Sequence, residues 1–197
     1  MAAKKDEIRA RLVQNLAEVI TEDELKERLN SGEPLTHYIG FEISGYVHLG
    51  TGLMTGLVMK DLTDLGVQCT LWMADWHTII NEKLDGTLET AQKIGMGYFA
   101  EAMKASFLAV GGDPEKLEVR LASEWYNKDW MKYWEYVIRV SQNTTTSRMM
   151  RSIDIMGRAQ GTDIDHARTI YPSLQVADIF YQELAIAHAG MDQRKAH

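Results

Sequence analysis

The sequence predicts an α/β fold in which a Rossmann-like parallel sheet is flanked by helices. Two apolar stretches, residues 37–42 and 67–74, have the near-continuous hydrophobic character of buried parallel strands. A helical pattern at residues 51–65 lies between them and stops at Gly66. Strand, helix and strand with short connections form a βαβ unit, and such units build parallel sheets.

Length and composition are those of a single globular domain with a sizeable core. The chain has 197 residues, of which 45% are hydrophobic and 25% are charged. The net charge of −7 gives no overall basic field, so a tRNA or DNA partner would need a local basic patch. Cys69 is the single cysteine, which excludes an internal disulfide. With no signal-peptide pattern and no membrane-spanning stretch, we expect a cytoplasmic protein without a membrane partner.

The first 36 residues are predicted to form a helical prefix. Residues 4–19 carry apolar side chains on one helical face. The segment Thr21–Glu24 has the pattern of a capping box, and it is expected to open a second helix that runs through Leu29. Gly32 and Pro34 would end that helix. We expect both helices to pack beside the main sheet.

Residues 37–197 are predicted to form the Rossmann-like domain. A long helix is expected at residues 87–110, and Gly111 and Gly112 break it. Residues 117–122 alternate between apolar and polar side chains, as a third strand would, and residues 184–188 indicate a last short strand.

A helical insertion is predicted at about residues 126–160. It contains an aromatic-rich helix at residues 129–140 and a second helical segment at residues 144–157. The aromatic side chains are interpreted as core or dimer packing rather than as a cofactor site.

Three polar residues are expected on one face of a helix that begins after Pro172. The spacing of four and three aligns Tyr171, Gln175 and Asp178. An amide and an acid among apolar neighbours are costly to bury without partners. These side chains therefore either face solvent or bind a polar ligand.

The turn after the first strand is a candidate anion site. The apolar strand pattern ends at Ser44-Gly45, and the sequence continues through His48 and Gly50 into a predicted helix. Unpaired amides and the helix dipole favour a phosphate at such a helix start, and a histidine there can donate to it. In the alternative interpretation, His48 only caps the helix and the glycines only make a tight turn.

Further polar residues follow the ends of predicted strands. Glu42 ends the first strand, and Asp75 and His77 follow the second. Ligands of open α/β sheets bind at the carboxyl ends of the strands, which makes these residues candidates for a binding site. The alternative for His77 is a hydrogen-bonded histidine of the core.

These motifs, taken in order, resemble the catalytic domain of a class I aminoacyl-tRNA synthetase, and most closely a tyrosyl-tRNA synthetase of the archaeal and eukaryotic type. The resemblance covers nearly all of residues 8–197. It rests on Tyr38-Ile39-Gly40-Phe41-Glu42 with Ser44-Gly45, His48-Leu49-Gly50, Ala74-Asp75-Trp76-His77, Ser123-Glu124, Thr144-Thr145 with Arg148 and Arg151-Ser152, Ile170-Tyr171-Pro172 with Gln175-Val176 and Asp178-Ile179, and Gly190-Met191-Asp192-Gln193-Arg194-Lys195.

The resemblance implies an enzyme that activates L-tyrosine with ATP and Mg²⁺ and transfers it to tRNA(Tyr), without a tightly bound cofactor or a protein-held metal. It implies catalytic roles at His48, Gly50 and Thr51, and contacts to ATP from Gly40, His48, Gly50 and Asp192. The tyrosine site would comprise Tyr38 and Asp178 at the phenol hydroxyl, Tyr171, Gln175 and Gln193 at the α-amino group, and Gly40, Glu42 and His77 around them.

The same resemblance implies contacts with the tRNA acceptor end and a homodimer. Arg151, Arg194 and Lys195 would approach the tRNA, with surface ion pairs as the alternative for Arg151. The helical insertion resembles the segment that pairs two subunits in this family, and its aromatic content fits an apolar interface.

Two departures from the family pattern stand out. The usual His-x-Gly-His motif has Thr51 in place of its second histidine. The second signature loop, of the Lys-Met-Ser-Lys-Ser type, would lie beyond His197, so we expect a chain that is truncated at its C-terminus relative to the family.

Other functions remain open from the sequence. A tyrosine- or adenylate-binding module without catalysis would also fit a chain that lacks the loop and the second histidine. Another nucleotidyltransferase could use the His-x-Gly turn, but it would have no use for the pair Tyr38 and Asp178. Tryptophan is a weaker substrate candidate, because an indole N–H needs only an acceptor.

Overall fold

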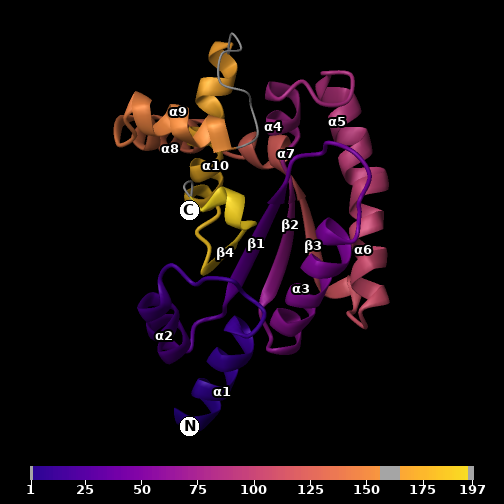
Figure 1. The fold of residues 1–197 in the computed structure, drawn as a ribbon, viewed down its shortest axis with the longest axis vertical. Helices are drawn as coiled ribbons and strands as arrows, with labels where there is room; N and C mark the ends of the chain where they lie inside the picture. Colours follow the sequence, from indigo (N-terminus) through magenta and orange to yellow (C-terminus); the bar gives the residue numbers. More distant parts are fainter. Residues whose placement is uncertain (1, 156–164, 195–197) are drawn as a thin grey trace.

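A computed structural model describes residues 2–155 and 165–194 (Figure 1). Its centre is a four-stranded sheet in the order β3-β2-β1-β4. β1 pairs in parallel with both β2 and β4, and β3 pairs in parallel with β2. The strands are β1 (Thr36–Phe41), β2 (Gln68–Met73), β3 (Leu117–Leu121) and β4 (Ile186–His188). The predicted fold class is confirmed, and each strand lies within two residues of its expected bounds.

Each face of the sheet has its own hydrophobic core, because successive side chains of a strand point to opposite faces. Ile39, Leu71 and Met73 belong to the cluster that faces α3 (Thr55–Asp64) and α6 (Ala100–Ala109). Tyr38 and Trp72, one position away, belong to the cluster that faces α8 (Trp130–Gln142) and α10 (His166–Tyr181). Figure 1 shows α3, α5 and α6 on one side of the sheet and α8 to α10 on the other.

The chain enters α3 through a π-helical turn, Gly50–Met54, at the position where a plain helix start was predicted. Gly52 in this turn is buried against α6, and a Cβ atom there would lie 2.5 Å from the Ser106 Oγ. Only glycine permits so close an approach. The predicted long helix is confirmed as a continuous run of α5 (Leu88–Ile94), a second π-turn (Gly95–Phe99) and α6.

The prefix contains two helices, as predicted, but its details differ. α1 (Ala2–Val13) ends well before residue 19, because the side-chain amides of Gln14 and Asn15 donate to Asp61 of α3 and the chain turns there. α2 (Glu22–Ser31) begins without a side-chain hydrogen bond from Thr21, so the predicted capping box is wrong. Three acidic residues in its first turn suit the helix dipole instead. Gly32, at φ 76°, ends it as expected.

Two short helices after the strands were not predicted. α4 (Asp75–Ile80) follows β2 and α7 (Ala122–Tyr126) follows β3. The predicted start of a helix after Pro172 is also wrong: α10 begins at His166 and contains Pro172. The Asp165 side chain accepts a hydrogen bond from the Arg168 N–H at 3.0 Å, which sets the earlier start.

The predicted insertion comprises α8 and α9 (Thr146–Ile155), and its residues 156–160 lie outside the described part of the chain. No helix among the described residues is both long and apolar enough to cross a bilayer.

Candidate active site at the carboxyl ends of the strands

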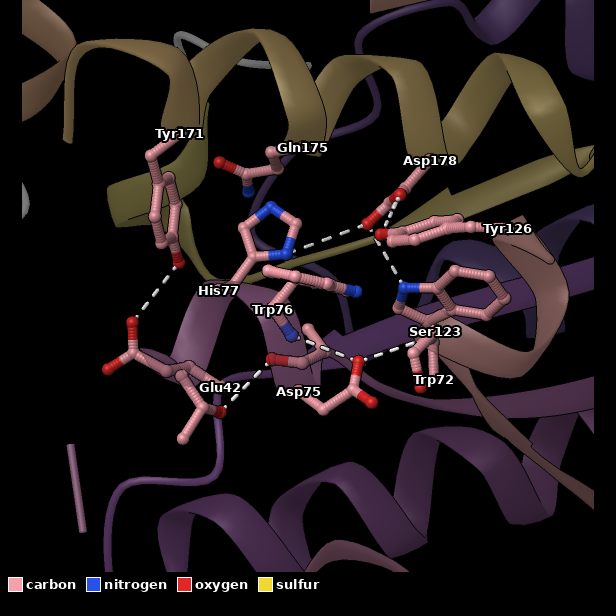
Figure 2. Close-up of polar contacts among 12 residues, drawn as sticks. Glu42, Trp72, Asp75, Trp76, His77, Ser123, Tyr126, Tyr171, Gln175 and Asp178 are labelled. Carbon is pink, nitrogen blue, oxygen red and sulfur yellow. Dashed lines mark hydrogen bonds and ion pairs between the residues drawn. The ribbon is translucent and has the colours of Figure 1, made fainter. Parts of the chain in front are cut away.

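The candidate site lies where β1 and β2 end and α10 passes beside them (Figure 2). Glu42 follows β1, and Asp75 and His77 begin α4 directly after β2. From α10, Gln175 and Asp178 project toward His77, and Tyr171 projects toward Glu42, as Figure 2 shows. The predicted alignment of the three α10 side chains therefore matches their placement.

Asp178 is the centre of the site. Its carboxylate is fully buried and receives three hydrogen bonds. Oδ1 accepts from the Tyr126 hydroxyl at 2.6 Å and from the Tyr133 hydroxyl at 3.0 Å, and Oδ2 accepts from the Trp72 indole N–H at 3.0 Å. Burial raises the pKa of Asp178 to about 7, and the three hydrogen bonds act in the opposite direction.

Sequence reasoning did not assign the three donors to the site. The sequence predicts core or dimer packing for the aromatic helix that contains Tyr133, it places Trp72 in the second strand, and it places Tyr126 at the start of the helical insertion. The sequence did contain one indication of these contacts, because a buried indole N–H or phenol hydroxyl usually has a hydrogen-bond partner. The identity of that partner required the three-dimensional structure.

Tyr38 presents its hydroxyl on the same face of the sheet as Trp72. Its side chain is buried, and its hydroxyl makes no hydrogen bond with any residue that the structure describes. Burial, followed by the nearby charge of Asp178, raises the pKa of Tyr38 well above its ordinary value. A Cβ atom at Gly40 would collide with the Tyr38 hydroxyl, so glycine leaves room at this point.

His77 lies between Asp178 and Tyr171. Its Nδ1 is 3.9 Å from Asp178 Oδ2, and its ring packs edge-on against that of Tyr171 at 4.5 Å between centroids. Both ring nitrogens are buried without a hydrogen-bond partner among the described residues. Burial lowers the pKa of His77 to about 4, so the ring is neutral at pH 7. A neutral ring offers one N–H donor and one acceptor to a ligand.

Glu42 is held at the opposite end of the site. The Tyr171 hydroxyl donates to its Oε2 at 3.3 Å, and the Asn81 side-chain amide donates to the same oxygen. Lys83 Nζ lies 3.9 Å from Oε1. Asn81 and Lys83 are neighbours of the site that the sequence did not indicate.

Hydrogen bonds between side-chain amides link α10 to the segment that follows β4. Gln175 Nε2 donates to Gln193 Oε1 at 2.8 Å, and Gln193 Nε2 donates to Asp192 Oδ2 at 2.7 Å. The structure thus brings Gln193 to α10, while Asp192 is exposed beside it.

Asp75 follows the end of β2, and its hydrogen bonds connect that strand end to α7. Its Oδ1 accepts from the backbone N–H groups of Trp76 at 2.9 Å and of Ser123 at 3.1 Å. These bonds tie the end of β2 to the start of α7, which fixes the edge on which the site is built.

The turn before α3 brings His48 and Thr51 together. His48 Nδ1 accepts from the Thr51 backbone N–H at 3.3 Å, and His48 Nε2 lies 3.0 Å from Thr51 Oγ1. Since Nδ1 accepts, the proton of a neutral ring is on Nε2, and it donates to the threonine oxygen. The Thr51 hydroxyl hydrogen is then available to a ligand. Gly50 lies directly between them, and His48 and Gly50 are exposed.

The basic residues expected near tRNA are in different settings. Arg194 forms an ion pair with Glu18 of the prefix at 2.5 Å, and it lines a cavity of about 520 Å³ between the prefix and β4. Arg151 is exposed on α9 and forms no ion pair within the described segments. Lys195 lies outside the described residues.

Taken together, the site offers a buried acceptor at Asp178, an unpaired hydroxyl at Tyr38, a neutral histidine and a polar end formed by Glu42 and the glutamines. A ligand with one hydroxyl on an apolar body and polar groups at its far end would satisfy these groups.

Comparison with known proteins gives a consistent result. The family described as "tRNA synthetases class I (W and Y)" matches residues 30–196. The tyrosine–tRNA ligase of Thermococcus sibiricus is 58% identical over 180 residues, which are 91% of this chain and 48% of that protein. The chain therefore spans about half the length of the curated relatives it matches.

Solved structures agree with the sequence relatives. Tyrosyl-tRNA synthetase from Pyrococcus horikoshii, complexed with L-tyrosine, matches with a TM-score of 0.92 at 51% identity, over 98% of this chain and 52% of that chain. The enzyme from Aeropyrum pernix matches with a TM-score of 0.81 at 36% identity, over 98% and 55% of the two chains. The fold and the relatives agree, and this chain belongs to the class I tRNA synthetases of the tryptophanyl and tyrosyl group.

Proposed function

We propose that this chain is the tyrosine-activating part of a tyrosine–tRNA ligase, which joins L-tyrosine and ATP into tyrosyl-adenylate and passes tyrosine to tRNA(Tyr). The observation that carries the proposal is the buried pair of Asp178, which accepts hydrogen bonds, and Tyr38, whose hydroxyl has no partner among the described residues. A phenol hydroxyl can donate to the first and accept from the second. An indole N–H could use only the acceptor, which favours tyrosine over tryptophan.

The substrate would lie along α10. Its hydroxyl would meet Tyr38 and Asp178, and its α-amino group would meet Tyr171, Gln175 and Gln193, with Glu42 and His77 beside it. Asp178 lies seven positions after Tyr171, so the two ends of the site are roughly 10 Å apart along the helix axis.

The nucleotide would lie on the turn formed by His48, Gly50 and Thr51, with Gly40 beside it and Asp192 at the ribose. Adenylation needs positioning of the carboxylate and stabilisation of charge on the α-phosphate, because the tyrosine oxygen displaces pyrophosphate from phosphorus. The hydrogen bond from His48 to Thr51 turns the threonine hydroxyl into a donor for a phosphate oxygen. Among the described residues, no cluster of three or more His, Cys, Asp or Glu could hold a metal ion. Mg²⁺ would arrive bound to the ATP phosphates.

Tyrosine-dependent exchange of pyrophosphate into ATP tests the activity. We expect the chain to catalyse exchange, and we expect Thr51→Val to lower the rate about tenfold, since one hydrogen bond to developing charge is worth roughly 1.5 kcal/mol. Tyrosine affinity should stay unchanged, because Thr51 lies outside the amino-acid site. Tyrosine binding without exchange would favour the alternative, a non-catalytic tyrosine- or adenylate-binding module.

The assembly would be a homodimer formed through the helical insertion. α8 buries Tyr133 and Val137 but leaves a row of large hydrophobic side chains exposed, and α10 adds one more. These exposed residues are Trp130, Met131, Trp134, Ile138 and Phe180. An exposed apolar patch of this kind is typical of a subunit interface.

Trp134→Glu is expected to convert a dimer into a monomer, because it places a charge in the apolar interface. Sedimentation velocity measures the change. The control is Leu108→Glu, which alters another exposed apolar residue, on α6 and away from α8, and should leave the dimer intact. A wild-type chain that sediments as a monomer at high micromolar concentration would contradict the homodimer.

Further parts of the proposal concern the whole protein. Residues 1–36 would be an N-terminal helical prefix, and residues 37–197 would be the catalytic domain of a cytoplasmic translation enzyme. The acceptor end of tRNA would approach Arg151, Arg194 and Lys195, and Arg194 would reach it from the side of the prefix, where it pairs with Glu18.

A further inference from the structure

The hydrogen bonds to Asp178 leave little room for a ligand. An ionised carboxylate has about four acceptor positions, two on each oxygen. The hydroxyls of Tyr126 and Tyr133 occupy both positions on Oδ1, and the Trp72 indole occupies one of the two on Oδ2. One acceptor position is left, and it is on the oxygen that lies 3.9 Å from His77.

We propose that Trp72, Tyr126 and Tyr133 are positioning residues for the substrate hydroxyl, because their hydrogen bonds favour the carboxylate form of Asp178 and leave it a single open acceptor position on Oδ2. This inference rests on the tyrosine site proposed above. A protonated Asp178 would offer its own hydrogen where the substrate hydroxyl must donate, so the charge of Asp178 decides whether the hydroxyl is recognised.

The three donors are themselves held rigidly. The rings of Tyr126 and Tyr133 stack at 3.8 Å between centroids, and that of Tyr181 packs edge-on against Tyr133 at 5.4 Å. Trp72 is fully buried and contacts both Tyr38 and Tyr126 ring to ring. Donors fixed in this way cannot follow the carboxylate if it rotates, so they determine its orientation.

No other group around Asp178 that the structure describes favours its charged form, so that form depends on the three donors. The other titratable groups near it are His77 and Asp75 from α4 and Tyr38 from β1. His77 is neutral, Asp75 is another acid that opposes a second negative charge, and Tyr38 is neutral at physiological pH. No cation among the described residues pairs with the Asp178 carboxylate, so the hydrogen bonds from Trp72, Tyr126 and Tyr133 are what favour its charged form.

Tyr133→Phe removes one donor and keeps the ring. Two quantities are measured: the titration of the Asp178 carboxyl carbon by NMR in the ligand-free chain, assigned with Asp178→Asn, and the Kd of L-tyrosine by calorimetry from pH 6 to pH 9. Loss of one hydrogen bond to a charged group should raise the titration midpoint by about one pH unit. Tyrosine binding should then be about fivefold weaker at pH 7 and nearly equal to wild type at pH 9, since the carboxylate reforms.

Tyr181→Phe is the matched control, because Tyr181 belongs to the same aromatic cluster but its hydroxyl donates to the Trp125 carbonyl at 3.0 Å. It should leave both quantities unchanged. Tyr126→Phe is the second variant and should behave like Tyr133→Phe. An unchanged midpoint with equal loss of tyrosine affinity at every pH would overturn the proposal and leave only a packing role. A raised midpoint in a chain that binds no tyrosine even before mutation would support the hydrogen-bond role and refute the tyrosine site.

Discussion

Replacing Asp178 by alanine is expected to lower the free energy of unfolding by roughly 3–5 kcal/mol. The variant leaves the Trp72 indole and the Tyr126 and Tyr133 hydroxyls buried without an acceptor, at a cost of roughly 1–3 kcal/mol each. Removal of a carboxylate whose burial raises its pKa to about 7 offsets part of that cost. Urea denaturation measures the difference, which is a large share of the stability of an ordinary domain.

Glu135→Ala is the control for this experiment. Glu135 is an exposed acid that pairs with Arg139 on α8, and loss of such a surface pair changes stability by at most about 1 kcal/mol. If Asp178→Ala were as mild as Glu135→Ala, the three donors would not depend on Asp178 for their hydrogen bonds, and the description of the site would be wrong.

The second large effect is the rejection of phenylalanine. Bound phenylalanine would leave the Tyr38 hydroxyl and the open position on Asp178 Oδ2 unpaired in a buried site. At roughly 1–3 kcal/mol for each of the two unpaired groups, we expect tyrosine to bind about 30- to 20,000-fold more tightly than phenylalanine. Calorimetric titration of both amino acids measures the ratio.

Tyr38→Phe should narrow that ratio about tenfold, because it removes a hydrogen bond to bound tyrosine and also removes the hydroxyl that bound phenylalanine leaves unpaired. Tyr46→Phe is the matched control, because Tyr46 is an exposed tyrosine outside the site. If the wild-type chain bound the two amino acids with equal affinity, the site would not recognise the substrate hydroxyl.

The elements predicted best from the sequence are those governed by local periodicity. The strands at Thr36–Phe41 and Gln68–Met73 were recognisable because buried parallel strands are continuously apolar. The spacing of Tyr171, Gln175 and Asp178 gave their shared helical face correctly even though the predicted start of that helix was wrong. A proline in a helix interior ordinarily costs about 3 kcal/mol, which is why Pro172 suggested a helix start, but α10 begins upstream at the Asp165 cap and continues through Pro172.

The contacts that make the site were not predictable, because they join residues far apart in the sequence. Asp178 is 106 residues from Trp72, 52 from Tyr126 and 45 from Tyr133. Periodicity assigns each of these aromatic residues to a core and says nothing of its polar atom. The pairing of Thr51 with His48 was likewise hidden, because it depends on the π-turn that Gly52 permits.

A crystal structure of this chain with L-tyrosine would show where the substrate hydroxyl and amino group lie relative to Asp178 and α10. We expect the phenol oxygen to lie within hydrogen-bond distance of the Tyr38 hydroxyl and of Asp178 Oδ2, with Tyr126 and Tyr133 still donating to Oδ1. We also expect the α-amino group to lie beside Tyr171 and Gln175. Tyrosine bound with its amino group at Asp178, or bound away from α10, would contradict the account.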